Sequence, residues 1–167
     1  MDRRAEAEAV DAGDWRRRAG VARDATHMAA KMRWLKGALG SDRKTMGFHQ
    51  PVSYLVARPT GGHVFDHGLA STVMLYSLAR RDFDPEPLAA FGIAADEPPS
   101  IAEASDRAGP LSAAGAERAG LPAGIPVAVG TGDDFAAPLG AGSGRAGTRH
   151  LRARLDAEAL SARHAER

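Results

Sequence analysis

A chain of 167 residues and 17.5 kDa can bury one hydrophobic core, so we expect one domain or part of a larger one. Its 22 basic and 21 acidic side chains leave a formal charge of +1, which gives no electrostatic reason to expect nucleic acid or an anionic membrane as a partner. The lack of cysteine excludes disulfides and thiolate metal sites, and no apolar run approaches the length of a membrane span, so we expect a cytoplasmic protein.

The first half of the chain predicts helices on either side of a short extended segment. Residues 2–18 are alanine-rich and charged, which favours a solvated helix that is broken near Gly13. Residues 25–39 favour an amphipathic helix, because four apolar side chains recur on one face: Met28, Met32, Leu35 and Leu39. Extended backbone is expected at 63–65, and the helical spacing of Leu69, Val73 and Tyr76 follows it.

The second half contains clearer start and stop signals. Asp84 and Pro85 predict the N-cap and first residue of a short helix that Gly92 ends. Residues 96–110 are polar and contain proline, so they are expected to form a connecting loop. A second short helix is expected over 112–119.

The segment PVAVGTGDDFAAPLGAG, residues 126–142, is the most informative of the chain. A valine-rich run, a glycine turn and small residues predict a buried strand, a turn and a helix. In an open α/β sheet, ligands bind beyond the carboxyl end of such a strand. Asp133 is therefore the candidate catalytic residue, and the alternative is an aspartate that only caps the helix.

Five segments follow one another in the order and spacing of a known family's motifs. They are MDRRAEAEA at 1–9, KMRWL at 31–35, SYLVARPTGG at 53–62, HVFDHGLASTVMLY at 63–76 and AGLPAGIPVAVGTGDDFAAPLGAG at 119–142. In the same order, these segments are similar to the family patterns W-x-D-x-R (here without its tryptophan), K-x-x-W-L, D-Y-L-x-x-x-L-T-G, T-D-x-S-x-A-S-x-T-x-L-F and T-G-L-P-x-G-x-P-V-x-x-G-x-G-D. The chain thus resembles the FGGY family of carbohydrate kinases, and within it the xylulokinase-like members.

The resemblance implies part of an actin-like, ribonuclease H-like α/β domain, incomplete at its N-terminus and without the second domain. We expect residues 1–142 to be part of the sugar-binding N-terminal domain and 143–167 to be a divergent tail, helical or disordered. The G-x-D-x-G-T-T hairpin that holds phosphates in the family does not occur in these residues. We therefore expect a kinase fragment that is inactive alone.

The resemblance also implies roles for individual residues. Asp133 corresponds to the catalytic base, and Asp134, Asp2 and Arg4 to substrate-binding positions. Gly130 and Gly132 correspond to the glycines of the cofactor-binding turn. ATP and Mg²⁺ are the implied cofactors of the intact enzyme, with none expected on this chain alone, and the implied substrate is a sugar such as xylulose, or a polyol.

The sequence leaves three questions open: the function of this chain alone, its partner and the presence of a metal cluster. The chain could instead be a non-catalytic sugar-binding module or one half of a split kinase. A homodimer or a complementing kinase segment would then be its partner. His63, Asp66 and His67 could form a metal cluster, although polar groups of a loop are the commoner interpretation of such a set.

Overall fold

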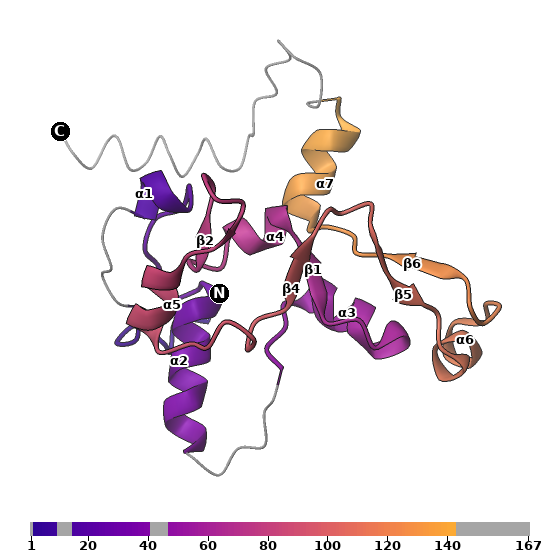
Figure 1. Cartoon of the computed structure of the whole chain (residues 1–167), viewed down its shortest axis with the longest axis horizontal. Helices are drawn as coiled ribbons and strands as arrows, with labels where there is room; N and C mark the ends of the chain where they lie inside the picture. Colours follow the sequence, from indigo (N-terminus) through magenta and orange to yellow (C-terminus); the bar gives the residue numbers. More distant parts are fainter. Residues whose placement is uncertain (1, 10–14, 41–46, 143–167) are drawn as a thin grey trace. The chain divides into compact units, whose positions relative to one another are not determined.

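The computed structural model describes residues 2–9, 15–40 and 47–142, so the predicted tail over 143–167 lies outside the described residues (Figure 1). It divides into two compact units, Met1–Thr131 and Gly132–Arg167, and each is described by itself. The helices are α1 (Trp15–Arg18), α2 (Met28–Leu39), α3 (Pro51–Thr60), α4 (His67–Ser71), α5 (Pro85–Phe91), α6 (Ala113–Ala119) and α7 (Asp133–Gly140). The strands are β1 (Val64–Asp66), β2 (Tyr76–Ser77), β3 (Asp82–Phe83), β4 (Ser100–Ala102), β5 (Arg107–Pro110) and β6 (Pro126–Ala128).

The strands of the first unit form three two-stranded sheets. β1 and β4 are parallel, with Val64 opposite Ser100. β2 pairs with β3, and β5 with β6, both antiparallel. Figure 1 shows α6 at the end of the β5 and β6 ribbon, where the chain turns from one strand to the other. This ribbon leads directly into the predicted functional turn.

The core of the first unit gathers side chains from α2, β1 and the residues around α4 and α5. Met32, Phe65, Leu75 and Phe91 are among its largest fully buried side chains. The predicted apolar stripe of α2 is only partly buried, because Leu39 at its end is 49% exposed. Burial of these few large side chains supplies the hydrophobic stabilisation of a chain that is poor in aromatic residues.

The short helices that local capping signals predicted are present. The Asp84 side chain accepts a hydrogen bond from the Glu86 amide at the start of α5, and Gly92 ends this helix in the left-handed conformation. Ser112 caps α6 in the same way, and Gly120 ends it. Both helices begin and end where their caps place them.

The predicted loop over 96–110 is wrong, because it contains two strands. β4 and β5 lie within it, and each is paired with a strand distant in the sequence. The helical interpretation of Leu69, Val73 and Tyr76 is also wrong beyond Ser71, where α4 ends. Met74 has a φ of 65°, a left-handed conformation that a right-handed helix does not accommodate.

Two further expectations need correction in the first unit. The described residues 2–9 form turns rather than a solvated helix, and Ala5 and Ala9 are buried. The predicted burial of β6 is wrong, because its three residues are exposed or only partly buried in a two-stranded sheet with β5. No helix among the described residues is both long enough and apolar enough to cross a membrane.

Candidate functional site

The second unit begins with the two aspartates of the predicted active site. Asp133 and Asp134 are the first two residues of α7, and both are exposed. The cap position is Gly132, and no side chain makes a capping hydrogen bond. The structure therefore does not use Asp133 as a helix cap. The helix dipole favours negative charge at this end of α7, where both carboxylates lie.

The turn before these aspartates depends on glycine. Gly130 has a φ of 72°, a region that other residues rarely adopt. Its amide donates to the Ala104 carbonyl oxygen at 2.9 Å, and the Val129 amide donates to the Asp106 carbonyl oxygen at 2.9 Å. The backbone leaving β6 is thus held by the segment between β4 and β5. This explains the glycine structurally and leaves its predicted cofactor role a prediction.

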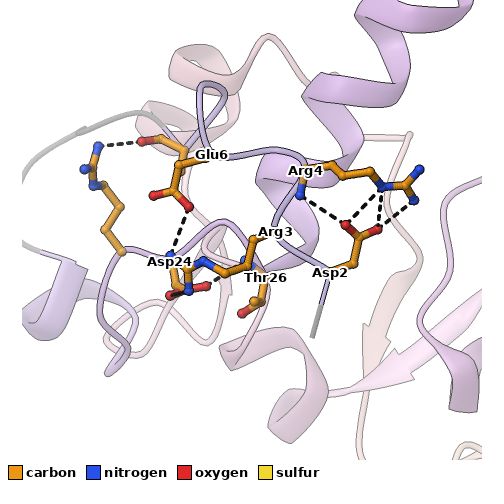
Figure 2. A network of polar contacts seen from close by, with 8 residues as sticks. Asp2, Arg3, Arg4, Glu6, Asp24 and Thr26 are labelled. Atoms are coloured by element: carbon orange, nitrogen blue, oxygen red, sulfur yellow. Dashed lines mark hydrogen bonds and ion pairs between the residues drawn. The ribbon is translucent and has the colours of Figure 1, made fainter.

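The N-terminal segment brings together the other two predicted site residues, Asp2 and Arg4 (Figure 2). Arg4 Nη2 donates to Asp2 Oδ2 at 2.7 Å, and Arg4 Nε donates to Asp2 Oδ1 at 3.0 Å. The Arg4 side chain holds the pKa of the Asp2 carboxyl well below its usual range. Both groups are therefore charged at neutral pH. Asp133 and Asp134 belong to the other unit.

Arg4 is also stacked on an aromatic side chain that the sequence motifs left without a role. Its Cζ lies 4.8 Å from the centroid of the Trp34 ring. Trp34 lies on α2 and is half-buried against the core. Trp34 belongs to the motif KMRWL, which marks it as a residue of interest. Nothing in the sequence, however, indicates that it contacts Arg4. The contact fixes the plane of the guanidinium.

A second network ties the same segment to the start of α2 (Figure 2). Arg3 Nη1 donates to Asp24 Oδ2 at 2.9 Å, and Arg3 Nη2 donates to Glu6 at 2.9 Å. The Thr26 amide donates to Asp24 Oδ1 at 2.7 Å. This backbone hydrogen bond, followed by the contacts of Arg3, lowers the pKa of Asp24 to about 2. Asp24 therefore holds residues 2–9 against the turn that precedes α2.

A cavity of about 390 Å³ opens in the first unit beside α2. Its walls come from the first turns of α2, from residues 48–50 before α3, from Pro51 and from Thr72. Met28, Met32, Leu35 and Phe48 make it apolar, and Lys31 and His49 are among its polar lining residues. The sequence predicted the apolar stripe of α2 but gave no sign of a cavity beside it.

The three residues considered as a metal cluster have separate contacts. Asp66 caps α4 by accepting from the Gly68 and Leu69 amides at 3.1 and 3.0 Å. His67 Nδ1 lies 2.8 Å from the Tyr76 hydroxyl. The His63 ring packs on His49 with 4.3 Å between centroids, and burial, followed by the charge of His63, lowers the pKa of His49. Within the described ranges, no group of three such side chains could hold a metal ion.

Comparison with known proteins identifies the class. The model of the FGGY family of carbohydrate kinases, N-terminal domain, matches residues 5–140, so the chain belongs to this family. The glycerol kinase of Alkalilimnicola ehrlichii is 34% identical over 140 residues, which are 80% of this chain and 27% of that protein. The L-fuculokinase of Salmonella typhi is 41% identical over 86 residues, 52% of this chain and 18% of that protein.

Solved structures agree with this result. The xylulose kinase from Rhodospirillum rubrum superposes with a TM-score of 0.69 at 27% identity, over 83% of this chain and 29% of that chain. Two predictions are thereby confirmed. The chain belongs to the predicted family, and its fold is part of the predicted actin-like α/β domain. The chain spans about a quarter of the length of the curated relatives it matches.

Proposed function

We propose that this chain provides the sugar-binding part of a carbohydrate kinase that transfers the γ-phosphate of ATP to a hydroxyl of a ketose, such as xylulose, or of a polyol. The observation that carries the proposal is the family match over residues 5–140, which includes the turn and helix start bearing Asp133. The relatives described above are named glycerol kinase, L-fuculokinase and xylulose kinase, and each name describes a kinase that acts on a polyol or a sugar. A cytoplasmic location, where ATP is available, belongs to the same proposal.

Asp133 is the proposed base. Its exposed carboxylate accepts the proton of the substrate hydroxyl while that oxygen forms a bond to the γ-phosphorus and the bond from phosphorus to the ADP oxygen breaks. Asp134 is proposed to hold a second hydroxyl. Mg²⁺ bound with ATP would supply neutralisation of the phosphate charge during the transfer. We propose that Gly130 and Gly132 let the backbone approach the nucleotide closely, since neither carries a side chain.

Arg4 is the proposed donor to the sugar, and Asp2 its positioning residue. Asp2 occupies Arg4 Nε and Nη2. A guanidinium has five N–H donors, so Nη1 remains for a substrate oxygen. The contact with Trp34 holds the plane of the group, which reduces the ordering needed when a sugar binds. Asp2 therefore contributes through Arg4 rather than by direct contact.

Replacement of Asp133 tests the proposal. The enzyme to use is a chimera in which residues 5–140 replace the matched region of the Alkalilimnicola ehrlichii glycerol kinase, assayed beside the isolated chain. Asp133→Ala should lower kcat by about 10²- to 10⁴-fold. The melting temperature should change little, because Asp133 is exposed, no side chain caps α7, and a surface charge at a helix N-terminus contributes at most about 1 kcal/mol. Glu117→Ala, which removes an exposed carboxylate from α6, is the matched control and should leave kcat unchanged.

Unchanged turnover in Asp133→Ala would remove this residue from the mechanism. A second candidate function is a non-catalytic sugar-binding module or one half of a split kinase with a homodimeric or complementing partner. Sugar binding by the isolated chain without ATP turnover, together with co-purification of a complementing kinase segment, would support it.

A further inference from the structure

The cavity beside α2 has the size and walls of a small-molecule site. Its volume of about 390 Å³ lies within the range of roughly 300–1,000 Å³ that such sites occupy. Met28, Met32, Leu35 and Phe48 give it an apolar surface. Thioether and aromatic groups of this kind adapt to ligands of varied shape. The cavity is formed within the first unit and contains none of the residues proposed above for catalysis or sugar binding.

Most polar groups that line this cavity are already used within the protein. The Gln50 side-chain amide lies 3.3 Å from both the Leu69 carbonyl oxygen and the Thr72 hydroxyl. His27 Nε2 lies 3.0 Å from the Ala22 carbonyl oxygen, and His49 Nδ1 lies 3.1 Å from the Ser53 hydroxyl. These contacts keep the walls in place. They also leave few donors and acceptors for the several hydroxyls of a sugar.

Lys31 is the exception. Its ammonium has no hydrogen-bond partner among the described residues. Asp2 is near enough for Lys31 to contribute to its lowered pKa, but the Asp2 carboxylate is already paired with Arg4. No carboxylate of the described part of the chain lines the cavity. The cavity therefore combines an apolar wall with one available positive charge.

We propose that this cavity binds a small amphiphilic anion, with its apolar body against Met28, Leu35 and Phe48 and its carboxylate paired with Lys31. An ammonium forms a strong charge-assisted hydrogen bond with a carboxylate, and the apolar wall gains from covering hydrocarbon. A polyol gains neither contribution here. The site is thus distinct in ligand class from the proposed sugar site and does not depend on the proposed kinase reaction.

Calorimetric titration of the purified chain with 4-phenylbutyrate tests this. The neutral analogue 4-phenylbutan-1-ol has the same apolar body, and xylulose represents the polyols. We expect 4-phenylbutyrate to bind at least about tenfold more tightly than the alcohol, from the usual strength of a charge-assisted hydrogen bond. Lys31→Met should remove this difference while keeping the apolar stem. Leu35→Trp, which reduces the volume of the cavity, should weaken both aromatic ligands.

Lys36→Met is the matched control, because it removes the same charge from the same helix at a residue that does not line the cavity. It should leave the affinity for 4-phenylbutyrate unchanged. Circular dichroism of each variant excludes loss of folding as the cause. Equal affinity of the wild-type chain for the acid and the alcohol, no binding of either, or an undiminished preference in Lys31→Met would overturn the proposal. Displacement of 4-phenylbutyrate by xylulose at equal concentration would also overturn it.

Discussion

The Arg4 guanidinium lies over the Trp34 ring, 4.8 Å from its centroid, and thereby joins the second arginine of the N-terminal segment to the middle of α2. Because Trp15 is the only other tryptophan, a Trp15→Phe background reports Trp34 alone. In that background Arg4→Ala should shift the fluorescence emission to longer wavelength, since the change exposes the ring face to water. Arg17→Ala, at an exposed arginine of α1, is the control. An identical spectrum in Arg4→Ala would show that the stacked contact does not form in solution.

Asp24 should make stability depend on pH in the acid range. Its pKa is lowered to about 2 in the folded chain from 3.8, so the ionised form stabilises the fold. This contribution is fully present above about pH 5 and is lost as the pH falls through about 2. Asp24→Asn keeps an acceptor for the Thr26 amide but loses the charge, at a cost of about 1 kcal/mol at pH 7. Urea unfolding at several pH values measures the difference.

The wild-type and Asp24→Asn free energies of unfolding should converge as the pH falls through about 2, because the Asp24 carboxyl is protonated below 3.8 in the unfolded state but only below about 2 in the folded state. Asp106→Asn is a control acid of the same type for which no ion pair is found among the described residues. If the gap between wild type and Asp24→Asn were constant from pH 7 to pH 2, the charge of Asp24 would not be the source of its effect.

Asp66 should be important for stability rather than for metal binding. It is 6% exposed and accepts two amide hydrogen bonds at the start of α4. Asp66→Ala leaves both amides without this acceptor and should cost about 1–2 kcal/mol in the free energy of unfolding. Asp66→Ser retains a capping oxygen and should recover much of that loss. Equal stability of the alanine and serine variants in urea would show that capping is not the reason.

Local capping made part of this fold predictable. Asp84, Pro85 and Gly92 fixed both ends of α5 from their own side chains and backbone preferences, without any distant contact. The strand, turn and helix around Asp133 were predictable for the same reason, since valine, glycine and small residues each favour the local conformation found there. The family motifs added the order of the segments and the choice of Asp133 as the base.

What the sequence did not predict depends on distant partners. β4 contains three residues with no alternating pattern, and it is a strand only because β1 lies beside it, Val64 opposite Ser100. Arg4 and Trp34 are thirty residues apart in the sequence, and neither residue type predicts that the two side chains stack. The cavity is likewise formed by α2, the start of α3 and Thr72 together. No local pattern encodes such contacts.

Gly62 should be intolerant of any side chain because β5 passes close to it. A Cβ built at this residue would lie 2.5 Å from the Ala108 carbonyl oxygen, a distance that real Cβ atoms do not show. The obstacle is backbone, so relief requires a shift of β5 relative to the end of α3. Gly62→Ala should therefore lower the free energy of unfolding by about 1–3 kcal/mol.

Gly37→Ala is the matched control for Gly62→Ala. Gly37 lies inside α2, and a Cβ there would meet nothing within 4 Å. Alanine is favoured over glycine within a helix, so this variant should gain about 0.5–1 kcal/mol. Urea unfolding followed by circular dichroism should thus move the two midpoints in opposite directions. A Gly62→Ala midpoint at or above that of the wild type would mean that β5 does not approach Gly62 this closely in solution.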